Sequence, residues 1–120
     1  MRAPVSTLAD APDPIFAAIR QHKEAWDAFG VASTRADEAE AARDRRTVIA
    51  AEESAAAAGS ALERGCCEAF LRTLPSTESG IVAGLKYAAQ IDRDMGQTCN
   101  LKKFAKTLRQ SSLIAATRCT

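Results

Sequence analysis

Hydrophobic side chains in the first third of the chain recur at alternating four- and three-residue steps. The stripe consists of Ile15, Ile19, His22, Trp26, Phe29 and Ser33. This spacing places them on one face of an amphipathic helix. Just before the stripe, Asp13 can cap the helix and Pro14 suits its first position. The pattern predicts a helix over residues 14–43 that packs lengthwise against a partner helix.

The polar run at residues 43–46 leaves two interpretations open. No Pro or Gly interrupts residues 31–58, so one helix could pass through the run. A single helix with an alanine seam would need a partner along its whole length, so we favour a turn at residues 43–47. Thr47 would then cap a second helix over residues 48–74, which ends before Pro75. Its apolar face consists of Ala55, Gly59, Leu62, Cys66 and Phe70.

Two shorter helices are predicted in the remaining chain. Ser76 and Thr77 can cap a third helix over residues 77–95, and Asn100 can cap a fourth over residues 100–116. Gly80 and Gly84 lie four residues apart on the third helix, which indicates close helix packing. The expected fold is all-α: a long antiparallel helical hairpin plus two shorter C-terminal helices. A single domain over residues 13–116 would lie between a disordered leader (1–12) and a frayed tail (117–120).

The composition predicts a thin core. Alanine is abundant, whereas the chain has one Trp, one Tyr and four Phe. Small side chains bury little apolar area, so helices must approach closely and a lone hairpin would leave part of its coiled-coil-like seam exposed. A protein partner or homo-oligomer is therefore expected. The predicted core residues are Ile15, Ile19, Trp26, Phe29, Leu62, Cys66, Phe70, Ile81, Leu85, Phe104 and Leu108.

Charge is distributed unevenly along the chain. The net charge is +1, yet residues 97–120 carry five basic side chains and no acidic one. Lys102, Lys106 and Arg109 share a face of the fourth helix and could contact phosphates. The favoured interpretation is that they face the acidic surfaces of the first two helices, within the chain or across a dimer. Nucleic acid is thus a candidate partner that the near-neutral overall charge does not favour.

The chain shows neither an apolar leader nor an uncharged stretch long enough to cross a membrane. Its four cysteines follow neither a disulfide-framework spacing nor a zinc-finger spacing. These patterns predict a cytoplasmic protein that does not enter membranes.

Candidate chemical groups each have a simpler interpretation. His22 lies within the stripe, where we interpret it as a packing residue. Cys66 and Cys67 are adjacent, so a helix points them about 100° apart and one ion cannot easily be held by both. Cys66 is interpreted as core. The segment beginning at Asp92 lacks the glycine and glutamate positions of a calcium loop. We therefore predict no catalytic, cofactor-binding or metal-binding residue.

Several short segments of the sequence resemble segments of other proteins. The opening phrase at residues 13–19 is Asp-Pro-Ile-Phe-Ala-Ala-Ile, and it precedes His22-Lys23. Further along come Pro-Ser-Thr at residues 75–77 and Ala-Gly-Leu at residues 83–85. Over residues 13–90 the chain resembles short uncharacterised bacterial alanine-rich helical-hairpin proteins. The resemblance implies a helical hairpin and carries over no activity and no functional residue.

The sequence thus predicts a non-enzymatic helical module for protein interaction or self-association. One alternative is a small nucleic-acid-associated regulatory protein that uses the basic fourth helix. The other is a thiol-based redox or metal-responsive switch that uses Cys66 and Cys67.

Overall fold

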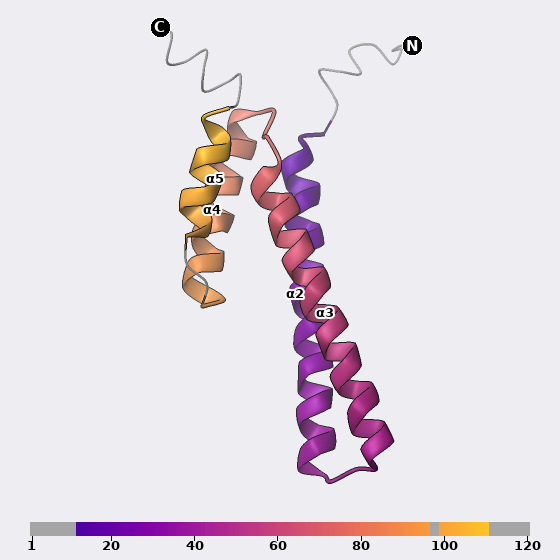
Figure 1. Ribbon diagram of the computed structural model, residues 1–120. Helices are drawn as coiled ribbons and strands as arrows, with labels where there is room; N and C mark the ends of the chain where they lie inside the picture. Colours follow the sequence, from indigo (N-terminus) through magenta and orange to yellow (C-terminus); the bar gives the residue numbers. More distant parts are fainter. Residues whose placement is uncertain (1–11, 97–98, 111–120) are drawn as a thin grey trace, which may run out of the picture. The chain divides into compact units, whose positions relative to one another are not determined.

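A computed structural model of the protein describes residues 12–96 and 99–110. Four helices make up this part of the chain, and it contains no strand (Figure 1). This confirms the all-α prediction. The helices are α2 (Pro14–Ala41), α3 (Arg46–Arg72), α4 (Glu78–Asp94) and α5 (Asn100–Leu108).

The helix bounds of α2, α3 and α4 lie within two residues of those expected from the pattern. The exception is α5, which ends at Leu108 rather than near residue 116. Residues 1–11 of the predicted leader, residues 111–116 of the predicted fourth helix and the predicted tail lie outside the described residues.

The chain forms two compact units within the range predicted as one domain. One unit comprises residues 18–72, and the other comprises, among the described residues, 12–17 together with 73–96 and 99–110. The first contains most of α2 and all of α3, and the second contains α4 and α5.

In the first unit, α2 and α3 form the predicted antiparallel hairpin (Figure 1). His22 of α2 contacts Glu63 of α3, whereas Phe29 of α2 lies against Gly59. A later residue of α2 therefore contacts an earlier residue of α3, as expected for antiparallel helices. A Cβ atom at Gly59 would lie 3.4 Å from the Phe29 Cα atom, which shows how closely the two backbones approach.

The turn between these helices confirms the two-helix interpretation of residues 43–47. The Asp44 N–H donates to the Ala39 carbonyl at 3.1 Å, and the Arg43 N–H donates to the Glu40 carbonyl at 3.1 Å. Arg43 adopts a left-handed backbone with φ 56°. This is a Schellman motif in which arginine occupies the position that glycine usually takes.

Two of the predicted caps are wrong. Thr47 lies inside the first turn of α3, which begins at Arg46, and the Arg45 carbonyl accepts from Val48 N–H at 2.8 Å. Asn100 is the first residue of α5, and Cys99 takes the cap position with φ 72° and no side-chain cap. Both predictions failed because a cap depends on backbone geometry that residue type only favours.

In the second unit, the Asp13 carboxylate joins the start of α2 to the start of α4. One oxygen accepts from Ile15 N–H at 3.0 Å, which confirms the predicted cap. The other accepts from Thr77 N–H at 3.0 Å and from its hydroxyl at 2.6 Å. Thr77 in turn caps α4 as predicted, accepting from Gly80 N–H at 2.9 Å. A Cβ at Gly80 would collide with Asp13, so glycine is what allows this contact.

A second carboxylate, Asp92 near the end of α4, supports the start of α5. It accepts from the backbone N–H and the side-chain amide of Asn100 and from Leu101 N–H, each at 3.0 Å. These N–H groups lack an intrahelical partner at a helix start, so Asp92 replaces the cap that Cys99 cannot supply.

The ring of Phe104 packs directly on Gly84, where a Cβ would lie 2.6 Å from the Phe104 Cε2 atom. This confirms close packing at the two glycines of α4. The buried face of this helix consists of Gly80, Gly84, Tyr87, Ala88 and Ile91. The predicted core residues Ile81 and Leu85 lie beside this face and are only half-buried. The prediction placed the buried face of α4 at its large apolar residues, whereas the closest contacts are made at Gly80 and Gly84.

Replacement of Asp92 by Asn should destabilise the protein by roughly 1–2 kcal/mol, because an amide cannot accept all three hydrogen bonds as well as a carboxylate does. Burial raises the pKa of Asp92, but hydrogen bonds from Leu101 and Asn100 outweigh it and hold the pKa below 3.8. A lowered folded-state pKa gives stability that is present above the unfolded value and lost as pH falls through the folded one. Chemical denaturation at pH 7 and at pH 3 should therefore show a smaller difference between variant and parent at the lower pH.

The matched control is Asp94→Asn, which removes an exposed carboxylate whose contact is the neighbouring Arg93. It should stay within about 0.5 kcal/mol of the parent at pH 7. Equal effects of the two substitutions would contradict the capping role of Asp92.

Candidate metal centre

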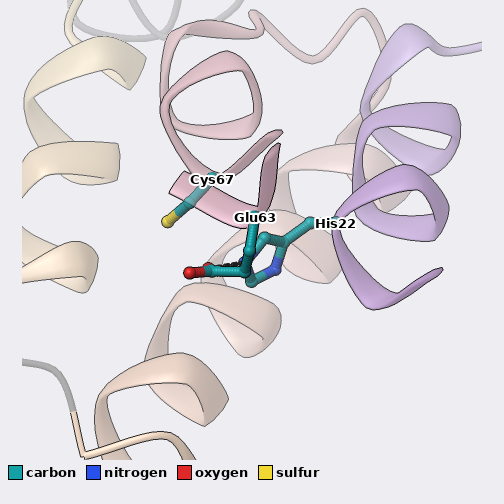
Figure 2. A group of neighbouring side chains, drawn as sticks. All are labelled: His22, Glu63 and Cys67. Atoms are coloured by element: carbon teal, nitrogen blue, oxygen red, sulfur yellow. Dashed lines mark hydrogen bonds and ion pairs between the residues drawn. The ribbon is translucent and has the colours of Figure 1, made fainter. Parts of the chain in front are cut away.

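The helical hairpin buries an ionisable pair between its two helices. His22 of α2 is completely buried, and Glu63 of α3 is only 3% exposed. The His22 Nε2 atom lies 2.6 Å from a Glu63 carboxylate oxygen (Figure 2). A buried charge is costly unless a partner compensates it, and here each group faces the other.

The spacing of α3 brings a third chemical group to the same place. Gly59, Glu63, Cys67 and Phe70 follow one another at steps of four, four and three residues, so they share a helix face. Gly59 and Phe70 pack as apolar positions of that face, and Glu63 and Cys67 lie between them. Cys67 is buried and forms no disulfide.

His22, Glu63 and Cys67 together form a candidate metal centre. One ligand atom of each (an imidazole nitrogen, a carboxylate oxygen and a thiol sulfur) lies within 4.8 Å of the other two (Figure 2). All three residues are buried. No other group of three such side chains with this geometry occurs in residues 12–96 and 99–110.

The donor set determines which ion could fit. Zinc binds imidazole nitrogen, carboxylate oxygen and thiolate sulfur at about 2.0–2.3 Å, which places tetrahedral ligand atoms about 3.5 Å apart. The His22–Glu63 contact of 2.6 Å is shorter than this, so the two side chains must separate by about 1 Å to admit the ion. Three protein ligands leave a fourth position for water or another donor.

The structure corrects the predicted face of α3. Leu62 is 60% exposed and Cys66 is only half-buried, although both were predicted as core. The buried positions are one residue later, at Glu63 and Cys67. The apolar pattern indicated the neighbour of each, because Leu62 and Cys66 precede Phe70 at steps of four residues. The signal that could have found the site is the shared spacing of Gly59, Glu63, Cys67 and Phe70.

The remaining predicted core residues fall into two groups. The buried ones are Ile15, Phe70, Phe104 and Leu108. Those that are half-buried are Ile19, Trp26, Phe29, Ile81 and Leu85.

The three basic residues predicted for phosphate contact are brought together on α5. Lys102, Lys106 and Arg109 are exposed, and with Lys103 and Cys99 they line a groove of about 310 Å³. No acidic side chain of the described chain lines it. The groove and the candidate metal centre belong to different units and share no residue.

Comparison with known proteins adds no further constraint. No protein-family model, curated protein or solved structure matches the chain. The resemblance to bacterial helical-hairpin proteins therefore stays a prediction. None of the described helices combines the length and apolar character that crossing a membrane requires.

Thiol labelling should separate the two adjacent cysteines. In the native protein Cys67 should react most slowly, Cys66 at an intermediate rate and the exposed Cys99 fastest, because the order follows burial. Pulse labelling with a neutral alkylating reagent and peptide mass spectrometry measures the three rates. In denaturant the three rates should converge. Faster native labelling of Cys67 than of Cys66 would contradict the placement of Cys67 inside the hairpin.

Proposed function

We propose that the protein is a non-enzymatic, metal-binding helical hairpin whose physiological ion is zinc. The observation that carries this proposal is the convergence of His22, Glu63 and Cys67, all buried, with ligand atoms within 4.8 Å of one another. This is the metal-responsive alternative among the expected functions, with Cys67 rather than the pair Cys66 and Cys67 as its thiol ligand.

The donor atoms favour zinc over the common hard cations. Calcium and magnesium require mostly oxygen ligands, whereas this centre supplies one nitrogen, one sulfur and a single carboxylate. Imidazole with thiolate suits zinc, and a free cysteine such as Cys67 is kept reduced in the cytosol. The proposal therefore includes a cytoplasmic location.

Metal binding would act on the hairpin as a cross-link. His22 is on α2, and Glu63 and Cys67 are on α3, so one ion would join both helices. Every buried side-chain nitrogen and oxygen of the described residues already has a hydrogen-bond partner. Zinc must therefore replace the His22–Glu63 hydrogen bond and the thiol proton. The protein would fold without zinc and become more stable with it. The stability of the hairpin would then depend on the free zinc concentration.

Zinc should raise the stability of the metal-free protein by about 2.7 kcal/mol at a free concentration one hundred times the Kd. Cys67→Ser and Glu63→Gln should each weaken zinc binding at least tenfold. Loss of a residue that only hydrogen-bonds to a metal ligand typically weakens metal binding about 10–100-fold, and loss of the ligand itself should cost at least as much. Thermal melts after chelator treatment, with and without added zinc, measure the shift. Cobalt(II) should give a thiolate-to-metal charge-transfer band in the parent that Cys67→Ser abolishes.

The matched control is Cys66→Ser, which changes the adjacent thiol outside the cluster. It should retain the zinc shift and the cobalt band. Circular dichroism of each variant without metal establishes whether it still folds. A folded Cys67→Ser variant with the parent's zinc affinity would show that the cluster is not the site. Absence of any zinc-dependent shift in the parent would rule out the function.

A second candidate function, binding of nucleic acid through α5, is favoured by the basic groove. Lys102, Lys106 and Arg109 form no ion pair with a described residue, and an array of cations without acidic neighbours attracts phosphate groups. Phe104 is buried, so α5 offers no aromatic ring for base stacking. Any such binding would depend on charge rather than on base sequence.

If α5 contacts about three phosphates, the log–log slope of duplex DNA affinity against salt should be about −2.7. The triple variant Lys102→Glu, Lys106→Glu and Arg109→Glu should then abolish binding without loss of helicity. Fluorescence anisotropy with labelled DNA at several salt concentrations measures both quantities.

The control is the triple variant Arg20→Glu, Arg45→Glu and Arg46→Glu, which changes the net charge equally with exposed residues of the hairpin unit. It should retain most of the affinity. Equal losses in the two triple variants would mean that net charge, rather than the α5 groove, accounts for binding.

A further inference from the structure

The groove on α5 contains a thiol as well as positive charges. Cys99 lines it together with Lys102, Lys103, Lys106 and Arg109. From Cys99 onward these residues recur at steps of three or four, so they share one face of the helix. At 1.5 Å per residue, the four basic residues are attached about 5–15 Å along the helix axis from Cys99. A thiol and four cations therefore line one groove of about 310 Å³.

The Cys99 thiol is accessible and is not used to hold the helix. Cys99 is exposed and forms no disulfide. It occupies the cap position of α5 with φ 72°, and its side chain makes no cap hydrogen bond. The carboxylate of Asp92 accepts from the backbone N–H groups of Asn100 and Leu101 instead. Modification of the Cys99 sulfur would therefore leave the start of α5 intact.

The cations of the α5 groove are available to an incoming anion. All four are exposed, and none forms an ion pair with a described residue. No acidic side chain of the described chain lines the groove. Clustered charges of one sign raise the local concentration of small ions of opposite charge, over about 10 Å at 0.1 M salt. Anionic reagents therefore accumulate beside the thiol.

We propose that Cys99 is a site of thiol–disulfide exchange with anionic low-molecular-weight disulfides, and that the cations of the α5 groove select these reagents by charge. The Cys99 thiolate attacks one sulfur of the disulfide RSSR, so that a Cys99–SR bond forms and the original S–S bond breaks. One half of the reagent stays on Cys99, and the other leaves as the thiolate RS⁻. The thiol proton passes to solvent, and the leaving thiolate takes one up. No other oxidant takes part.

The exchange is reversible, because the reduced form of the same reagent can attack the mixed disulfide and release Cys99. Modification of Cys99 therefore follows the ratio of disulfide to thiol in its surroundings. The other two described cysteines lack this environment. Cys67 is buried, Cys66 is half-buried, and neither lines the groove. The groove also shares no residue with the candidate metal centre, so the exchange does not depend on zinc.

Disulfides of opposite charge test this proposal on the full-length protein. The anionic probe is glutathione disulfide and the cationic probe is cystamine. Each rate is divided by the rate of the same probe with N-acetylcysteinamide, an uncharged thiol, which removes intrinsic differences in reactivity. The normalised rate at Cys99 should be at least tenfold higher for the anionic probe at low salt, and the preference should shrink at about 0.5 M salt. Acid quenching and mass spectrometry of the Cys99 peptide measure the rates.

Neutralising the groove should remove the preference. In the triple variant Lys102→Gln, Lys103→Gln and Lys106→Gln, the ratio of anionic to cationic rates should fall at least tenfold, because one cation remains. Both rates are compared with that of neutral iodoacetamide at Cys99 in the same variant, which corrects for any change in thiol availability. Circular dichroism checks that helicity is unchanged.

The matched control is the triple variant Arg20→Gln, Arg45→Gln and Arg46→Gln, which lowers the net charge equally with exposed residues of the hairpin unit. It should keep most of the preference for the anionic probe. Equal normalised rates of the two probes in the parent would overturn the proposal. Equal losses in the two triple variants would also overturn it, because net charge rather than the α5 groove would then account for the preference.

Discussion

The contact between His22 and Glu63 is the constraint on which the hairpin depends. The two groups meet at 2.6 Å in the interior of an alanine-rich pair of helices. Apolar packing of small residues distinguishes poorly between alternative registers, because one alanine fits against another almost equally well. A shift of α3 by one turn would separate the two ionisable groups and leave both buried without a partner, which costs several kcal/mol. The same contact therefore sets the register that brings Gly59 against Phe29 and Cys67 into the cluster.

The second unit solves a related problem with carboxylates at helix ends. Asp13 serves the starts of both α2 and α4, and Asp92 serves the start of α5 from the end of α4. The α5 helix is nine residues long, and so short a helix is marginal alone in water. Asp92 accepts from the backbone N–H groups of Asn100 and Leu101 in its first turn, and its Phe104 ring covers Gly84. The hydrogen bonds to Asp92 and the contact of Phe104 with Gly84 thus stabilise a helix that would be marginal on its own.

Local signals were sufficient to predict the helices but not their buried faces. Pro14, Pro75 and the polar run at residues 43–46 indicated where helices begin and end, because these effects act within one turn. The faces of α3 and α4 were each misplaced by one residue. In both cases large apolar residues such as Leu62 were assigned to the core, while the positions that approach another helix carry glycine or glutamate. Burial of Gly84 depends on where Phe104 lies, and burial of Glu63 depends on His22. These partners lie twenty or more residues away, so no periodicity within the helix contains the information.

The two faces of α2 are joined through its aromatic residues. Phe29 lies against Gly59 inside the hairpin, and its ring meets Trp26 edge to face with centroids 6.1 Å apart. Trp26 is half-buried and lies one turn from His22. An ion held by His22, Glu63 and Cys67 would therefore lie beside the turn of α2 that positions this ring. The hairpin thus places its chemical centre and its outer surface one helical turn apart, with a single aromatic pair between them.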